Sequence, residues 1–248
     1  MRRQNIMSEA PTKSVHRAKR KPAADRKWVR YSAEDRLEMI LKEAVNFFAE
    51  HGFEAQTRDL AKRIGVSQGL IYRYFHTKEE LIDKVFHRIY MSRWNIYWEE
   101  LLSDRQIPLE RRLKEFYKSY LSTFDDYAWM RISVYSGDHY LVRRYLRVVF
   151  ERIIQVIYLE LRHECGLPQI DPSEISKLDA ELTWNLHATV IYLLIRRYVF
   201  QLGPSSDNNA VAEQAVDQFL VGTLRVLQKR YQNSAASLSP QPVGKSVA

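Results

Sequence analysis

Cysteine, glycine and proline are scarce in this 248-residue sequence, which has one cysteine, eight glycines and eight prolines. The single cysteine, Cys165, cannot form an intramolecular disulfide or a multi-cysteine zinc site. The low glycine and proline content disfavours turn-rich all-β folds and glycine-rich phosphate loops. No apolar run approaches the roughly 18 residues that span a bilayer, and no apolar stretch resembles a secretory signal. We therefore expect no membrane partner.

Positive charge is concentrated in the first 30 residues. They hold ten Lys and Arg against two acidic residues, whereas residues 31–248 hold 28 basic and 28 acidic residues, so the net charge of +8 lies at the N-terminus. This block has too few apolar residues to pack, which predicts a disordered basic arm. Such blocks often contact nucleic acid, and the alternative is a solvated leader.

From Tyr31 onward, apolar residues recur at helical spacing. Ser32 with Asp35, Thr57 and Thr77 are the expected N-terminal caps of the first, second and fourth helices. The pattern predicts helices over about 32–51, 58–64, 68–75, 77–102, 109–124, 126–136, 138–165, 172–202 and 208–232. No useful run alternates with period two, so the prediction is an all-α protein. It divides into the arm (1–30), a small module (31–78), a larger helical module (79–232) and a disordered tail (233–248).

The segment from Thr57 to Phe75 fits a helix-turn-helix. Ala61 supplies the small residue that two steeply crossing helices need, and Gly65 supplies a turn residue that tolerates positive φ. The apolar residues are spaced to bury one face. The residues left facing outward are Ser67, Gln68, Gly69, Tyr72 and Arg73, a set suited to a DNA groove. The alternative is an ordinary helical hairpin.

Residues 36–82 resemble the N-terminal domain of the TetR (tetracycline-repressor-like) family of transcriptional regulators. The resemblance is carried by the run Gly-Val-Ser-Gln-Gly-Leu-Ile-Tyr-Arg-Tyr-Phe-His-Thr-Lys-Glu-Glu-Leu from Gly65 to Leu81. It implies a three-helix DNA-binding domain with a helix-turn-helix at residues 31–78, followed by a larger ligand-binding and dimerisation domain. The C-terminal domain diverges widely in this family, so the resemblance does not name an effector.

The resemblance also implies which residues contact double-stranded DNA. Contacts to phosphate and sugar would come from Thr57, Arg58, Tyr72, Tyr74 and Lys78, with Arg58 also within reach of a base. Ser67, Gln68 and Gly69 would open the recognition helix close to the groove, and Arg73 would read a guanine.

Aromatic residues crowd the C-terminal half, where the resemblance implies a cavity for a small-molecule effector of apolar or aromatic character. For any single aromatic residue, a place in the core is the better interpretation. Polar residues on apolar faces are better candidates for orienting a ligand. The candidate pocket residues are Trp98, Tyr120, Arg131, Tyr135, His139, Trp184, Asn185 and His187.

The last two predicted helices carry long apolar stripes. In a lone chain these stripes could be core, whereas the resemblance implies that they pair across a two-fold axis as a four-helix bundle. The expected residues of this homodimer interface are Leu182, Ile191, Phe219, Leu220 and Leu227.

No motif of a metalloprotease, serine hydrolase or phosphate-binding enzyme occurs, so we expect neither an enzyme nor a cofactor nor a metal. The leading hypothesis is a cytoplasmic bacterial repressor, nucleoid-associated when DNA-bound, that a small molecule releases from a palindromic operator. A second is an effector-independent nucleoid- or division-associated DNA-binding protein of the same fold. A third is a helical enzyme or lipid carrier whose hairpin resembles the motif by accident.

Overall fold

The computed structural model describes residues 32–136, 139–203 and 207–238, with side chains as far as residue 232. Every regular element in these ranges is helical and none is a strand, which confirms the predicted all-α fold. The predicted basic arm and the part of the predicted tail after Leu238 lie outside the described residues. The α-helices are α1 (Ala33–His51), α2 (Thr57–Ile64), α3 (Gln68–Tyr74), α4 (Lys78–Ile89), α5 (Tyr97–Ser103), α6 (Leu109–Phe124), α7 (Tyr127–Tyr135), α8 (Tyr140–Val149), α9 (Gln155–Glu164), α10 (Lys177–Tyr198) and α11 (Asn208–Leu238).

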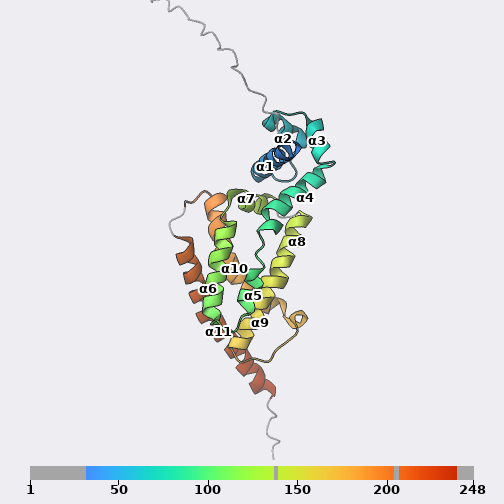
Figure 1. Ribbon diagram of the computed structural model, residues 1–248. Coiled ribbons are helices and arrows are strands. Elements are labelled where there is room, and N and C mark those ends of the chain that lie inside the picture. The colour runs from blue at the N-terminus through green and yellow to red at the C-terminus, as the bar shows by residue number, and fades with distance from the viewer. Residues whose placement is uncertain (1–31, 137–138, 204–206, 239–248) are drawn as a thin grey trace, which may run out of the picture.

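Helices α1, α2 and α3 form a small unit at one end of the molecule, and α5 to α11 form a longer bundle below it (Figure 1). Helix α4 leads from the small unit into the bundle, while α7 packs against α1 from the bundle side. The arrangement is that of an N-terminal helix-turn-helix domain with a larger C-terminal helical domain. The predicted boundary between them at residue 78 stays a prediction.

Local sequence explains why the small unit forms. Ser32 and Asp35 make the predicted capping box, in which the Ser32 hydroxyl accepts from the Asp35 N–H at 3.0 Å. Gly65 ends α2 in the left-handed conformation, with φ of 78° and ψ of 33°, where a side chain would be strained. The Thr77 hydroxyl caps α4 by accepting from the Glu80 N–H at 3.0 Å. These caps set where each helix begins or ends.

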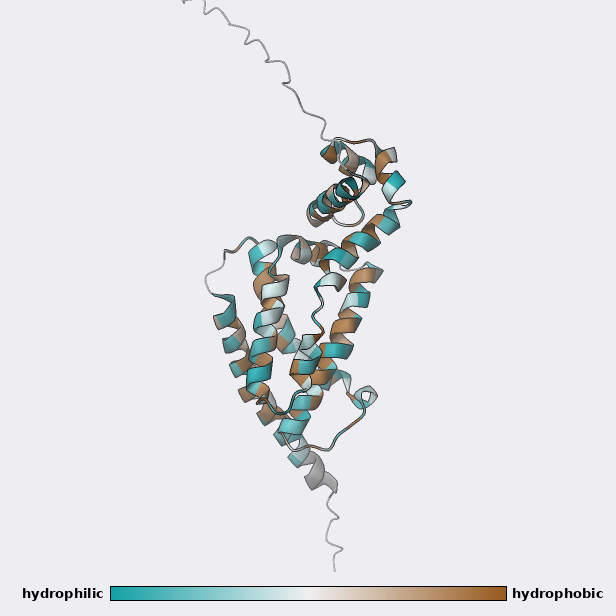
Figure 2. Cartoon of the chain, viewed as in Figure 1, coloured by the Kyte–Doolittle hydropathy of each residue, from teal (hydrophilic) through white to brown (hydrophobic). Residues whose placement is uncertain are grey.

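The helices of the bundle carry both hydrophobic and hydrophilic residues (Figure 2). Apolar residues at helical spacing form a stripe that the bundle can bury. Aromatic side chains dominate the interior. Trp98 from α5 lies against Phe116, Tyr120 and Phe124 of α6, with ring centroids 5.4 to 6.0 Å apart. Most of the aromatic residues are therefore core, as expected for any single one.

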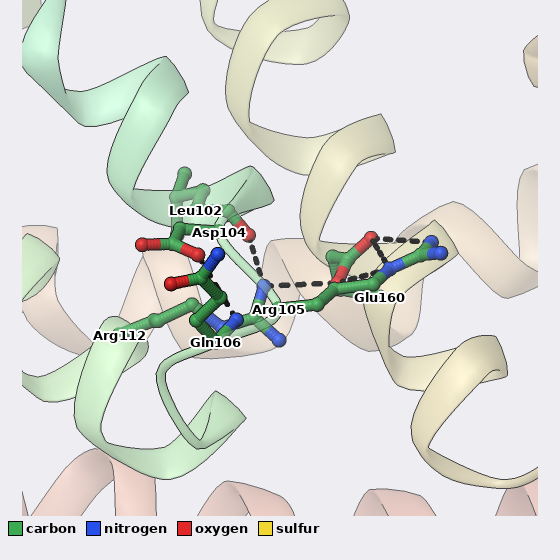
Figure 3. Close-up of polar contacts among 6 residues, drawn as sticks. All are labelled: Leu102, Asp104, Arg105, Gln106, Arg112 and Glu160. Carbon is green, nitrogen blue, oxygen red and sulfur yellow. Dashed lines mark hydrogen bonds and ion pairs between the residues drawn. The ribbon is translucent and has the colours of Figure 1, made fainter.

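An ion cluster around the buried Glu160 and Arg112 ties α5, α6 and α9 together (Figure 3). These helices meet in the part of the bundle away from the small unit (Figure 1). The Glu160 carboxylate accepts from Arg112 at 2.9 Å and from Arg105 at 2.9 Å, and Arg112 also donates to the Leu102 carbonyl. Burial by itself would raise the pKa of Glu160, but the two arginines outweigh it and hold that pKa below its usual value. The cluster thus links α5 and α6, which carry many of the interior aromatic residues, to α9.

The helix predicted to run from Thr77 towards residue 102 is broken, so this prediction was wrong. Helix α4 ends at Ile89, a short 3-10 turn follows over Met91–Arg93, and α5 begins at Tyr97. Short polar side chains offer the backbone other hydrogen bonds in this stretch. The Ser92 hydroxyl donates to the Arg88 carbonyl at 2.7 Å, and Asn95 Oδ1 accepts from the Tyr97 N–H at 3.0 Å.

Other helix boundaries also differ from the predictions. Thr57 does not cap α2, because it is the first helical residue, and Gln56 precedes it without a capping side chain. The helix predicted over 172–202 starts at Lys177, where the Ser176 hydroxyl caps it, and a 3-10 turn covers Pro172–Glu174. The helix predicted over 138–165 contains a π-helical turn at Phe150–Ile154. Helix α11 continues to Leu238, beyond the predicted end at residue 232.

Candidate nucleic-acid interface

Helix α3 presents a polar face outward from the small unit. Ile71 is fully buried on its inner side, whereas Gln68, Gly69 and Arg73 are exposed and Tyr72 is half-buried. These outward residues lie at spacings of one, four and five, which places them on one side of a helix. The structure therefore brings together the predicted base-reading residues of the recognition helix. Apart from the adjacent residues and the backbone of α3 itself, no described atom lies within 4 Å of a Cβ added to Gly69, so α3 is open at this point.

Thr57 faces inward and links α2 to α3. Its side chain is only 3% exposed, so it does not lie at the surface where a phosphate would be reached. The Thr57 hydroxyl accepts from Gln68 Nε2 at 2.9 Å and lies 2.9 Å from the Tyr72 hydroxyl. Residue spacing had not suggested this network, because it joins residues 11 and 15 positions apart across the turn.

The other predicted DNA contacts surround this face. Arg58 is exposed in the first turn of α2, and Lys78 is the first residue of α4. Ser67 is exposed, but its hydroxyl caps α3 by accepting from the Leu70 N–H at 3.2 Å. Tyr74 is half-buried and packs against the apolar core. Arg58 and Lys78 lie on either side of α3 in the sequence. Among the described residues, neither side chain forms an ion pair.

Ion pairs hold α2 and α4 against α1. Arg63 of α2 donates to both oxygens of Glu50 at 2.6 and 2.8 Å, and Arg88 of α4 donates to Glu38 at 2.7 Å. The hydrogen bond from Arg63 lowers the pKa of Glu50 below its usual value. Both pairs are substantially exposed, so each contributes orientation more than stability.

The small unit is attached to the bundle where α1 ends against α7. Arg131 Nε donates to the Ala49 carbonyl at 3.0 Å, and the buried Phe53 N–H donates to the Ser136 hydroxyl at 3.0 Å. The Phe53 ring meets His139 edge-to-face with centroids 5.0 Å apart. These contacts fix the orientation of α1, on which α2 and α3 rest.

Four of the predicted pocket residues converge inside the bundle. Tyr120 lies between Trp98 and His187, with ring centroids 5.4 and 5.2 Å away, and Trp184 lies 5.6 Å from His187. Trp98, Tyr120 and His187 are buried, and Trp184 is half-buried. Tyr117 joins them, with its ring centroid 6.2 Å from that of His187, and Thr183 is fully buried. Thr183 shares a face of α10 with His187, four residues later, a spacing that sequence reasoning missed.

The remaining predicted pocket residues do not join this group, because tertiary packing turns them elsewhere. Arg131 lies at the contact between α1 and α7, with its guanidinium over the rings of Tyr127 and Tyr135. Tyr135 is 46% exposed, and Asn185 lies on the outer face of α10. His139 caps α8 beside Phe53. The eight predicted residues are therefore not one site.

Polar atoms inside the aromatic interior are left without hydrogen-bond partners. The Tyr117 hydroxyl, the Thr183 hydroxyl and His187 Nδ1 are each buried and have no partner among the described atoms. Burial lowers the pKa of His187 to about 4, so this imidazole is neutral at pH 7. Buried polar groups in native proteins are nearly always paired with protein atoms or ordered water, so these three are candidates for holding a polar group.

The predicted dimer residues divide by burial. Leu220 and Leu227 are 9% and 3% exposed and pack within the core of the subunit, so they are not at its surface. Leu182, Ile191 and Phe219 are half-buried. The apolar side chains that stand outward on α10 and α11 are different ones, with Leu178 65%, Tyr192 52% and Val221 78% exposed.

The described ranges contain neither a candidate membrane-spanning helix nor a candidate metal site. None of the helices there combines the length and apolar character needed to cross a membrane. Within the same ranges, no group of three or more His, Cys, Asp and Glu side chains is arranged to hold a metal ion.

Residues 40–85 match the model of a protein family described as bacterial regulatory proteins, tetR family. An uncharacterised HTH-type transcriptional regulator of Bacillus subtilis, YhgD, is 45% identical over 53 residues, which are 21% of this chain and 28% of YhgD. The HTH-type transcriptional repressor KstR2 of Rhodococcus jostii is 25% identical over 189 residues, covering 74% of this chain and 88% of KstR2. YhgD thus matches over well under two thirds of its own length.

Solved structures show the same fold at low sequence identity. A TetR-like transcriptional regulator from Rhodococcus sp. RHA1 superposes with a TM-score of 0.56 at 16% identity, covering 78% of this chain and all of the other. A TetR family transcriptional regulator from Pseudomonas syringae gives a TM-score of 0.52 at 19% identity, covering 77% and 97% of the two chains. At this identity the likeness concerns the fold.

Proposed function

We propose that this protein, which belongs to the tetR family of bacterial regulatory proteins, is a homodimeric repressor that a small molecule releases from a palindromic operator. The observation that carries the proposal is the exposed polar face of α3, built from Gln68, Gly69, Tyr72 and Arg73 on a helix-turn-helix. Several relatives are named transcriptional repressors, which supports repression over activation. Its place of action is the bacterial cytoplasm, at the nucleoid when DNA is bound.

In this proposal α3 enters the major groove. Gln68 and Arg73 reach base edges, and the bare backbone at Gly69 allows close approach. Arg58 and Lys78 contact phosphates on either side, Lys78 where the N-terminus of α4 also attracts an anion. Tyr72 contributes its ring and hydroxyl to the sugar-phosphate backbone. Tyr74 packs against the core and supports α3.

A palindromic operator requires two copies of the helix-turn-helix, because one such module contacts few base pairs. We place the subunit contact on the outward faces of α10 and α11, around Leu178, Tyr192 and Val221. These apolar side chains are exposed in the subunit, and a four-helix bundle between two copies would bury them.

The effector is proposed to bind in the aromatic interior around Tyr117, Tyr120, Thr183 and His187. The surrounding rings favour an apolar or aromatic ligand, and the three unpartnered polar atoms would orient its polar groups. Contacts lead from this site towards the small unit: the Tyr120 hydroxyl lies 2.9 Å from that of Tyr145, whose ring is 4.7 Å from that of Tyr90. The Tyr90 hydroxyl, at the end of α4, lies 2.6 Å from the Ser133 hydroxyl of α7. Helix α7 in turn contacts α1.

The test is selection of genomic DNA fragments by the full chain, followed by footprinting of the bound fragments. We expect a two-fold symmetric protected site whose half-sites are separated by about one helical turn or a multiple of it. A panel of aromatic and apolar small molecules is then screened for release of that DNA. The variant Thr183→Val, matched in shape, should keep DNA binding and alter the response to the releasing compound.

Different outcomes favour different functions. A protected palindrome that no compound releases would favour the effector-independent DNA-binding protein of the same fold. Binding to all DNA with equal affinity would overturn the repressor proposal altogether.

A further inference from the structure

We propose that Thr57 is a positioning residue for base recognition: its buried hydroxyl holds the Gln68 amide and the Tyr72 hydroxyl in place and does not itself contact DNA. This inference rests on the proposed function of α3 in the major groove. It assigns Thr57 a role different from the phosphate contact that the family resemblance implies.

The first support is the location of the Thr57 side chain. It is 3% exposed, whereas a residue that contacts phosphate through its side chain needs solvent access. Its hydroxyl is also occupied, with both neighbours at 2.9 Å. One hydroxyl has a single hydrogen and two lone pairs, so two close partners leave little capacity for a third.

The second support is the position of Gln68. Its side chain is on the exposed face of α3, and an unrestrained glutamine there would sample many rotamers. The hydrogen bond from Nε2 to Thr57 selects one of these rotamers and fixes the plane of the amide. An amide that is held before binding loses less entropy when it meets a base edge.

The restraint also determines what Gln68 can read. With one Nε2 hydrogen directed to Thr57, the amide oxygen and the second Nε2 hydrogen are left to face the groove. In the major groove, adenine and cytosine present an exocyclic amino donor, whereas guanine and thymine present carbonyl acceptors at the equivalent edge. Adenine presents an amino donor beside the N7 acceptor, which match the amide oxygen and the second hydrogen, so Gln68 held in this way favours adenine.

The same hydroxyl prepares Tyr72. Because Thr57 accepts from Gln68, it can donate its own hydrogen to the Tyr72 oxygen, which leaves the Tyr72 hydrogen free for a phosphate oxygen. A single buried hydroxyl would then coordinate one base contact and one backbone contact from successive turns of α3.

The test uses the full chain and an operator in which the base pair read by Gln68 is replaced by each of the other three. That base pair is identified as the one whose preference disappears in Gln68→Ala. The wild type should favour adenine about tenfold or more. Thr57→Val should reduce this preference to the level of Gln68→Ala, whereas Thr57→Ser, which keeps the hydroxyl, should retain it.

Two comparisons separate positioning from a merely structural role. In the Gln68→Ala background, Thr57→Val should change the base preference no further, although loss of the Tyr72 contact still lowers affinity on every sequence. Thermal unfolding checks that each variant is folded, and Thr57→Ala serves as a second replacement if Thr57→Val is unfolded.

A hydroxyl-free Thr57 variant that loses affinity equally on all four operators, with its preference unchanged, would overturn the positioning role while leaving the proposed function intact. A wild-type chain that shows no sequence preference at all would overturn the proposed function, and this inference with it.

Discussion

Single side chains at the DNA-facing end differ in what they can recognise. Lys78 offers a point charge at the start of α4, whereas Gln68 and Arg73 offer hydrogen-bonding edges on α3. Phosphates are alike in every sequence, so a cation that contacts one contributes affinity without preference. Base edges differ, so we expect the residues of α3 to contribute preference.

Replacing Lys78 with alanine should therefore weaken binding to every DNA sequence by a similar factor. The slope of log affinity against log salt should become shallower by about one unit, because one fewer counterion is released. Lys84→Ala is the matched control, since it removes the same charge from the same helix about 9 Å further along the axis. Equal slopes in both variants, measured across a salt series, would contradict a phosphate contact at Lys78.

His187 is predicted to make the protein sensitive to mild acid. Its pKa is about 4 in the folded protein because burial disfavours the imidazolium, whereas the unperturbed value is 6.5. Between these values the unfolded chain binds more protons, so stability should fall as the pH drops from about 6.5 towards 4. Between pH 7 and pH 5 the loss from this residue should be about 2 kcal/mol.

Urea unfolding at both pH values and one protein concentration measures this effect. His187→Gln should lose less stability on acidification than the wild type, while His163→Gln, at an exposed position, should behave like the wild type. Identical acid sensitivity of His187→Gln and wild type would show that another group is responsible.

At the scale of elements, the molecule depends on the contact between α1 and α7. Gly52 ends α1 with φ of 75° and ψ of 171°, a region that side chains rarely adopt. A Cβ at this position would lie 3.4 Å from the Tyr135 carbonyl oxygen of α7. The glycine thus allows α1 to end directly against the bundle.

Gly52→Ala should lower the free energy of unfolding by about 1–3 kcal/mol, through backbone strain and this close contact. Gly69→Ala is the matched substitution in a helical position with open space around it, and it should leave stability unchanged or raise it by up to about 1 kcal/mol. Urea unfolding distinguishes them. Gly69→Ala should instead weaken DNA binding, because the added methyl group would face the groove in the proposed complex.

At the scale of the whole molecule, the proposed dimer requires side chains that the subunit leaves exposed. Val221→Glu should give folded monomers that fail to bind the operator, since Val221 is 78% exposed and plays little part in the subunit core. Leu220→Glu would unfold the subunit instead, because Leu220 is buried. Val134→Glu, on the exposed side of α7, is the matched control and should remain dimeric in sedimentation equilibrium. A dimeric Val221→Glu chain would place the interface elsewhere.

The N-terminal arm is expected to supply much of the electrostatic attraction to DNA. The helix-turn-helix region at residues 31–90 is close to neutral, with nine basic and ten acidic residues, whereas residues 1–30 carry +8. If four arm residues engage phosphates, a chain starting at Tyr31 should show a salt slope flatter by about 3–4 units. Sequence preference should survive. A full-length chain with glutamine at the ten basic arm positions separates charge from length, and unchanged slopes would make the arm a solvated leader.

The sequence by itself was sufficient for features that depend on neighbours along the chain. The capping box at Ser32, the left-handed Gly65 and the outward spacing of α3 could all be predicted, because caps and helical faces are set by residues one to four positions apart. Tertiary structure decided which helices meet. It turned Thr57 inward, moved Arg131 to the contact between α1 and α7, and buried Leu220 in the subunit. An apolar stripe predicts that a face is buried, but it does not predict which helix packs against that face. The polar groups that meet at Thr57 and around His187 could therefore be identified only from the tertiary structure.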